Sequence, residues 1–85
     1  MCRDPLDHLA LVRFGVGLAG QVDLRIYGLD GRLVRTVHSG MLPPGTYRET
    51  WDGRDDGGQQ VASGIYFVRL RAPDVTESRR ITLVK

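Results

Sequence analysis

The fold of this chain is decided by residues 21–38, which read QVDLRIYGLDGRLVRTVH. Within this stretch Val22, Leu24 and Ile26 alternate with polar or amphipathic residues, and a period of two over six residues indicates a half-buried β-strand. The pair Asp30-Gly31 then separates two apolar runs. Such a pair tolerates positive φ and is a strong hairpin signal. The stretch therefore predicts two antiparallel strands with one apolar face.

Glycines and prolines also separate short apolar runs on both sides of this hairpin. These runs are about 8–12 residues apart, a spacing typical of an all-β sandwich. The expected strands are residues 8–16, 21–27, 32–38, 45–51, 65–72 and 76–85. The run at 32–38 does not alternate strictly, which predicts a β-bulge there, and residues 39–44 are expected to form a loop. No window shows a sustained helical period, so no helix longer than one turn is expected.

Length and composition narrow the class of protein further. Eighty-five residues allow one domain, predicted as a lead-in at residues 1–7 and a β-sandwich at 8–85. The net charge is +2, and eleven arginines are spread among ten acidic residues, which does not favour nucleic-acid binding. No apolar stretch approaches the ~20 residues that span a bilayer. Because Met1 is followed by Cys2-Arg3-Asp4-Pro5, no signal peptide is expected at this start.

Side chains that carry chemistry are sparse. The single cysteine excludes an internal disulfide, and Cys2, His8 and His38 are too widely spaced for a zinc quartet. No serine or cysteine has a base nearby in a recognisable nucleophile pattern, and Ser63-Gly64 lacks the flanking residues of a nucleophile elbow. The sequence thus predicts no enzyme, no cofactor and no catalytic residue.

The segment DGRDDGGQQ at residues 52–60 is the one dense cluster of ligand-type side chains. Asp52, Asp55 and Asp56 with backbone carbonyls have the oxygen ligands that calcium prefers, although their spacing is not that of an EF-hand. Aspartate and glycine are also the residues that tight turns require. Both interpretations stay open, and the turn interpretation is preferred.

Aromatic side chains fall on both faces of the predicted strands. Tyr47, Trp51 and Tyr66 are expected to point inward, where large side chains fill a small core. Tyr27 and Phe67 are expected to point outward, which leaves a weak alternative of carbohydrate binding. Glu49 shares the inward face with its aromatic neighbours, so either that strand lies at an edge or an arginine pairs with this carboxylate.

Five segments together resemble one known family. They are VDLRIY at 22–27, DGRLVRTV at 30–37, WDGRDDGG at 51–58, VASGIYFVRL at 61–70 and LVK at 83–85. From residue 12 to the last residue the chain resembles the FlgD-type Ig-like domain family, which includes the Ig-like domain of the flagellar hook-capping protein and the C-terminal sorting domains of type IX secretion. The resemblance implies a seven-stranded Ig-like β-sandwich without catalytic residues.

The resemblance also implies a function. It points to a non-enzymatic C-terminal module that sorts, anchors at the cell surface or spaces an exported bacterial protein. The alternative is a structural assembly module like the hook-capping domain. The expected partners are the rest of a longer exported protein and either the secretion machinery or further copies, at an extracellular or cell-surface location, with no nucleic acid and no membrane insertion. Recognition positions carried over from the family are Arg32 and Lys85, and structural motif positions are Gly31, Trp51, Asp52, Gly53, Ser63, Gly64 and Tyr66.

Overall fold

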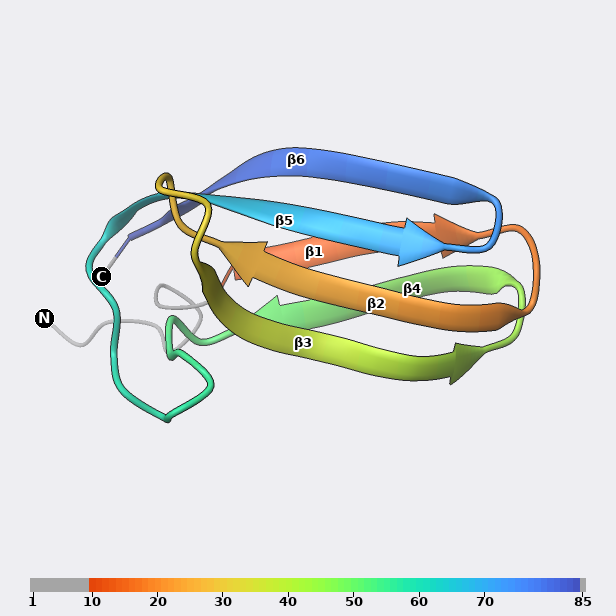
Figure 1. Cartoon of the computed structure of the whole chain (residues 1–85), viewed down its shortest axis with the longest axis horizontal. Helices are drawn as coiled ribbons and strands as arrows, with labels where there is room; N and C mark the ends of the chain where they lie inside the picture. Colours follow the sequence, from red (N-terminus) through yellow and green to blue (C-terminus); the bar gives the residue numbers. More distant parts are fainter. Residues whose placement is uncertain (1–9, 85) are drawn as a thin grey trace, which may run out of the picture.

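The alternating stretch around Val22 forms an inner strand of a β-sandwich (Figure 1). The computed structural model describes residues 10–84, which contain six strands and no helix. The strands are β1 Ala10–Val16, β2 Gly20–Tyr27, β3 Leu33–Leu42, β4 Gly45–Trp51, β5 Gly64–Ala72 and β6 Val75–Leu83. They form an antiparallel pair β1-β4 and an antiparallel four-stranded sheet with the order β3-β2-β5-β6. The all-β prediction is confirmed.

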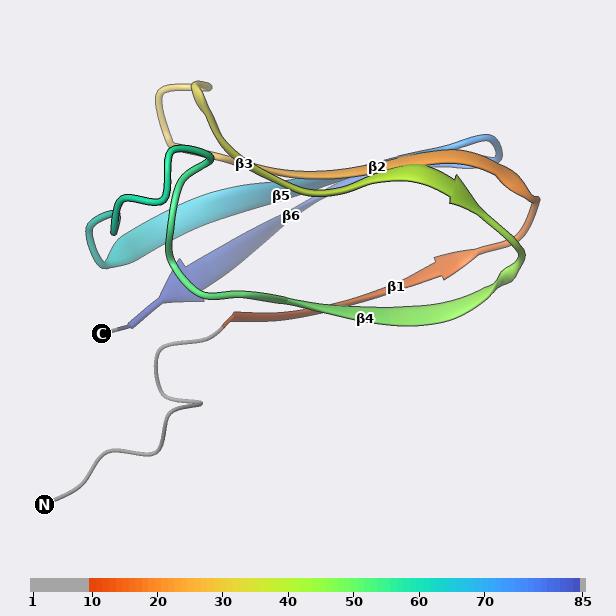
Figure 2. The same ribbon diagram turned by 90° about the horizontal axis from the view of Figure 1, so that it is seen from below.

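The two sheets face each other, and Figure 2 shows them as two layers with the core between them. Each inner face comes from the alternation that the sequence predicted, since every second residue of β1 and β2 is buried. The buried apolar residues are Ala10, Val12, Phe14, Val16, Val22, Leu24, Ile26, Trp51, Val68, Leu70 and Leu83. Strands β2 and β5 lie in the middle of the larger sheet and supply five of these residues.

Strand β3 is irregular, as the broken alternation of residues 32–38 predicts. Its register against β2 shifts twice, between Leu24 and Arg25 and between Ile26 and Tyr27. The expected loop at residues 39–44 is wrong for its first four residues, because β2 begins at Gly20 and still provides partners for β3 as far as Leu42. The prolines at 43 and 44 lack an N–H group to donate to the ladder, and they form the actual turn.

The seven strands implied by the family resemblance are not confirmed; residues 10–84 form six. The segment between β4 and β5, residues 52–63, makes one isolated bridge, between Arg54 and Gln60, and is otherwise turns. Its glycines and aspartates favour turns over extended backbone. Within residues 10–84 the smaller sheet consists of β1 and β4, and β4 is an edge strand. This confirms the first explanation offered for Glu49, which lies opposite Val12 and is only half-buried.

A side-chain hydrogen bond joins the two sheets. Arg79 of β6 donates from Nη2 to the carbonyl oxygen of Arg13 on β1 at 2.8 Å. None of the residues 10–84 belongs to a helix that could cross a membrane. The predicted lead-in at 1–7 and the predicted recognition residue Lys85 lie outside the described residues.

Candidate functional site

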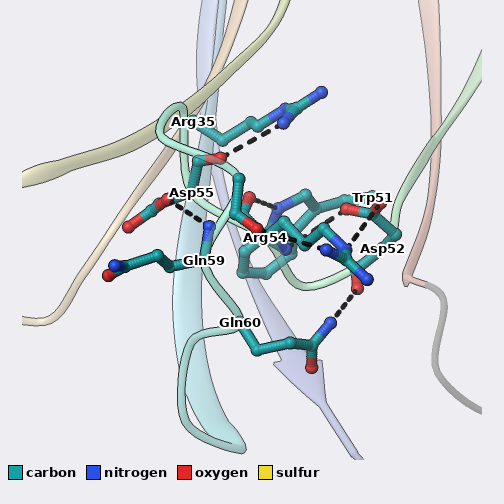
Figure 3. A network of polar contacts seen from close by, with 8 residues as sticks. Arg35, Trp51, Asp52, Arg54, Asp55, Gln59 and Gln60 are labelled. Carbon is teal, nitrogen blue, oxygen red and sulfur yellow. Dashed lines mark hydrogen bonds and ion pairs between the residues drawn. The ribbon is translucent and has the colours of Figure 1, made fainter.

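The densest polar network of the described residues lies in the aspartate loop, residues 52–63 between β4 and β5 (Figure 3). It is anchored by Trp51, whose side chain is 1% exposed and packs edge-on against Tyr66 with ring centroids 5.0 Å apart. The indole Nε1 of Trp51 donates to the carbonyl oxygen of Arg54 at 2.8 Å. A buried indole N–H needs such a partner, so the tryptophan holds the loop and the core together.

The carboxylates of Asp52 and Asp55 shape the loop from within. Asp55 accepts a hydrogen bond at Oδ1 from the backbone N–H of Gln59 at 2.9 Å, and Asp52 accepts one at Oδ1 from the N–H of Arg54 at 3.2 Å. The Arg54 guanidinium donates to the Gly58 carbonyl at 3.2 Å and lies 3.7 Å from Asp52 Oδ2. These are the side-chain-to-backbone bonds that define aspartate turns.

Asp56 attaches the loop to the free edge of β3. Its backbone N–H donates to the Val34 carbonyl at 3.0 Å, and its carboxylate accepts the Thr36 N–H at 2.9 Å. Beside it, Arg35 Nη1 donates to the Asp55 carbonyl at 3.2 Å (Figure 3). An edge strand presents unpaired backbone groups that invite other strands. The aspartate loop thus caps one stretch of this edge without being a strand.

This geometry favours the turn interpretation of the loop. Each of Asp52, Asp55 and Asp56 accepts a different backbone N–H, and the three carboxylates do not converge. Residues 10–84 contain no group of three or more histidine, cysteine or acidic side chains that could hold a metal ion. The turn interpretation accounts for the three aspartates, and the calcium alternative has no geometric support.

The hydrogen bond between the Thr36 N–H and the Asp56 carboxylate can be tested by itself. The substitution Asp56→Ala removes the acceptor of the Thr36 N–H, and we expect a loss of about 1 kcal/mol in the free energy of unfolding. Amide hydrogen exchange at Thr36 should accelerate, while the amides of β5 keep their protection. The control is Asp52→Ala, which removes an acceptor on the far side of the loop. Equal acceleration at Thr36 in both variants would show that Asp56 does not cap this edge.

The predicted recognition residue Arg32 lies in the β2–β3 turn and is exposed. Its N–H donates to Asp30 Oδ1 at 3.0 Å, and Gly31 adopts a φ of +82°, so the Asp-Gly turn predicted from sequence is confirmed. Because Lys85 is not among the described residues, no arrangement of Arg32 and Lys85 as a joint surface follows from the structure.

Four of the structural motif positions differ in their backbone angles and contacts: Gly53, Gly64, Tyr66 and Ser63. Gly53 has a φ of +78°, and a Cβ added to it would lie 2.9 Å from Leu83 Cδ2. Gly64 has a φ of +153°, which favours glycine, and nothing lies within 4 Å of a Cβ added to it. Tyr66 donates its hydroxyl to the Ala62 carbonyl, while Ser63 is exposed and its hydroxyl bonds none of the described residues.

A cluster that the sequence interpretation missed lies on the outer face of the four-stranded sheet. Asp23, Arg25 and Tyr27 of β2 stand opposite Arg71, Arg69 and Phe67 of β5. The sequence signal was present, because these positions alternate with buried ones, but the arginines looked like scattered solvated side chains. Strand pairing brings them together, and it also makes Tyr27 and Phe67 outward-facing neighbours.

Asp23 is the acidic member of this cluster, and several groups stabilise its charged form. Its Oδ1 accepts from Ser39 Oγ at 2.8 Å and from Gln21 Nε2 at 3.2 Å, and Arg25 Nη2 lies 3.8 Å away. The hydrogen bond from Ser39, then that from Gln21, and the charges of Arg25 and Arg71 lower the pKa of Asp23 below its ordinary value of 3.8.

This shift predicts a pH dependence. A carboxyl whose pKa is lower in the folded chain adds stability above its unfolded value, and that contribution is lost as pH falls through the folded pKa. We expect Ser39→Ala to raise the pKa of Asp23, measured by carbon-detected NMR titration of its carboxyl group. The stability difference between wild type and Ser39→Ala should shrink as pH falls below 3.8. A pKa of Asp23 that Ser39→Ala leaves unchanged would contradict the assignment.

Two comparisons show which known proteins this chain is similar to. The sequence model of the FlgD Ig-like domain matches residues 12–74, from β1 to the turn before β6. The basal-body rod modification proteins FlgD of Salmonella typhimurium and Salmonella typhi are each 40% identical to the chain, over 69% of this chain and 27% of the relative. The chain thus spans about a quarter of the length of these relatives. No solved structure matches. The matched segment contains the alternating strands, Trp51 and the aspartate loop, and this chain belongs to the FlgD Ig-like domain family.

Proposed function

We propose that this chain is a non-enzymatic Ig-like module that serves the assembly of a larger bacterial protein structure, as in the flagellar hook-capping protein. The observation that carries the proposal is the family match over residues 12–74, together with 40% identity to the Salmonella basal-body rod modification protein FlgD. The proposal corrects the order of preference drawn from sequence, where sorting of an exported protein came first.

The local chemistry supports a structural role. In the densest polar cluster of residues 10–84, the carboxylates of Asp52, Asp55 and Asp56 accept backbone N–H groups. The indole of Trp51 donates to a backbone carbonyl. Catalysis requires groups that converge on one reacting atom, whereas these groups point at the chain itself. The network stabilises a turn and an edge strand. A module that acts by binding through its surface needs its fold to be stabilised in this way.

A domain exchange tests the proposal. In Salmonella typhimurium FlgD, the segment that matches this chain is replaced by residues 10–84, and swimming in soft agar is compared with a deletion of that segment. We expect the exchanged protein to restore swimming at least in part. The control is the same exchange carrying Trp51→Ala, which should fail. A folded and expressed exchange that swims no better than the deletion would overturn the proposal.

A role in sorting or surface anchoring is the second candidate. It rests on the resemblance to type IX sorting domains, and one observation favours it: Val84, directly after buried Leu83, is 60% exposed. The test places residues 10–85 behind a signal peptide and a reporter in a host with type IX secretion. Surface display that is lost on deletion of residues 84–85 supports it. A periplasmic reporter that is indifferent to these residues contradicts it.

Carbohydrate binding is the weaker alternative. Tyr27 and Phe67 are neighbours on an outer face, but both are half-buried and two rings make a small platform for a sugar. A glycan screen without binding would remove this alternative.

A further inference from the structure

The outer face of the four-stranded sheet carries a cluster of arginines that the fold does not require. We call it the arginine face and define it by Arg25, Tyr27, Phe67, Arg69, Arg71 and Arg80, with Asp23 at one end. Strands β2, β5 and β6 lie side by side in Figure 1, in the layer nearer the viewer. Across them run in-register rows, in which Tyr27 pairs with Phe67 and Phe67 with Arg80, while Arg25 pairs with Arg69.

The charges of the arginine face are not balanced within the face. It holds four guanidinium groups and one carboxylate, and that carboxylate already accepts from Ser39 and Gln21. Arg25 and Arg69 are directly opposite each other, and like charges at such positions are destabilising. The Nε of Arg25 is buried and has no hydrogen-bond partner among residues 10–84. This nitrogen is itself closed off from the surface, so the evidence for an external acceptor is the excess of guanidinium charge, which Arg69 and Arg71 present on exposed side chains.

The spacing and geometry of the donors indicate what that acceptor is. Guanidinium groups bind carboxylates through two parallel hydrogen bonds. Arg69 and Arg71 are alternate residues of one strand, and their spacing of roughly 6.8 Å equals that of alternate side chains in an extended segment. A shallow depression between them is lined by Asp23, Arg25, Tyr27, Arg69 and Arg71. This surface suits an extended segment that runs along β5.

A row of apolar side chains lies beside the arginines, so the partner must also present an apolar side chain. Leu33 on β3 stands opposite Tyr27, which stands opposite Phe67. Leu33 and Ile65 are 45% and 40% exposed. Protein interfaces are enriched in aromatic residues and arginine and place them next to each other. Asp23 at the end of the face repels a continuous chain of phosphates, so a protein segment with separate carboxylates fits this surface better than a nucleic acid.

We propose that the arginine face binds an extended segment of a partner protein that carries carboxylates at alternate positions next to an apolar side chain. This inference rests on the proposed function, because both require that the module binds other proteins. It adds the place of contact and the chemistry of the partner, with the carboxylates on Arg25, Arg69 and Arg71 and the apolar side chain on Tyr27 and Phe67.

The test uses the full chain and a peptide probe, acetyl-Ser-Leu-Ser-Glu-Ser-Glu-Ser-amide, with a control peptide in which both glutamates are glutamine. Binding is followed by NMR of the arginine Nε–Hε groups. We expect the glutamate peptide to shift the signals of Arg25, Arg69 and Arg71 and to bind at least fivefold more tightly than the glutamine peptide. Its affinity should fall as salt rises.

Two double variants locate the binding. R69S/R71S removes two exposed arginines of the face and should weaken binding of the glutamate peptide at least tenfold with an unchanged melting temperature. The matched control R13S/R48S removes the opposed arginine pair on the outer face of the β1-β4 sheet and should leave the affinity unchanged. If R69S/R71S does not fold, R69Q/R71Q, which keeps most of the side-chain length, is measured instead.

Three outcomes would overturn the inference. They are equal binding of the two peptides, equal loss in the two double variants, and tighter binding of a ten-residue oligothymidylate than of the glutamate peptide at the same arginines. The domain exchange separates this inference from the proposed function. Restored swimming without selective binding of the glutamate peptide overturns the inference alone, and selective binding without restored swimming overturns the proposed function alone.

Discussion

The substitution Trp51→Ala is expected to lower the free energy of unfolding by about 3 to 5 kcal/mol, which leaves a domain of this size largely unfolded. Trp51 is 1% exposed and is the largest fully buried side chain of residues 10–84. Its removal leaves a cavity at the junction of β4 and the aspartate loop, beside Tyr66. It also leaves the Arg54 carbonyl without its indole donor. Urea denaturation followed by circular dichroism measures the loss.

The variant Trp51→Phe separates packing from hydrogen bonding. It keeps a large apolar ring against Tyr66 but cannot donate to the Arg54 carbonyl, so we expect a loss of about 1 to 2 kcal/mol from the missing bond and the smaller ring. Tyr66→Phe removes only the hydroxyl that donates to Ala62 and should cost about 1 kcal/mol. An unfolding midpoint that Trp51→Ala leaves unchanged would show that Trp51 does not organise the core.

The substitution Gly53→Ala is expected to have the second-largest effect, a loss of about 2 to 5 kcal/mol. Two physical causes add at this position. The φ of +78° is strained for any residue with a Cβ. The new Cβ would also lie 2.9 Å from Leu83 Cδ2 and 3.3 Å from Leu83 Cδ1. Leu83 is 2% exposed in the core, so it cannot move aside without disturbing its neighbours.

Two other glycines serve as matched controls for Gly53. Gly31 and Gly58 have φ values of +82° and +85°, and nothing lies within 4 Å of a Cβ added to either. Their alanine variants should lose only the conformational part, about 1 to 2 kcal/mol. The excess loss in Gly53→Ala then measures the contact with Leu83, and Leu83→Val in the same chain should recover part of it. A loss at Gly53 no larger than at Gly58 would contradict this account.

Trp51, Gly53 and Leu83 together explain why the aspartate loop belongs to the fold. The loop leaves β4 over a buried indole, passes Gly53 against the last core residue of β6, and then caps β3 through Asp56. Residues that looked like a ligand cluster in the sequence thus join both sheets. The arginine face is on the side of the four-stranded sheet opposite the core, so binding there does not require the buried residues to move.

The strands themselves were largely predictable. Alternation in residues 21–27 places Val22, Leu24 and Ile26 inside, and a shift of one residue would expose all three, so pattern and burial agree. The turn around Asp30-Gly31 was equally predictable, because turn chemistry is local. The alternation also gave six strands, which is the number that residues 10–84 form, whereas the count of seven came from the family resemblance and is not confirmed. What the sequence did not predict is that residues 52–63 cap an edge strand.

For this protein, sequence alone was sufficient for the all-β class, the inward faces and the turn at Asp30-Gly31, because periodicity and turn chemistry act over a few neighbouring residues. Only the tertiary structure decided what depends on pairing distant segments. It assigned Asp56 to the edge of β3, Gly53 to contact with Leu83, and Arg25 to the position opposite Arg69. These partners are far apart in the chain, and strand order and register, which no local pattern encodes, bring them together.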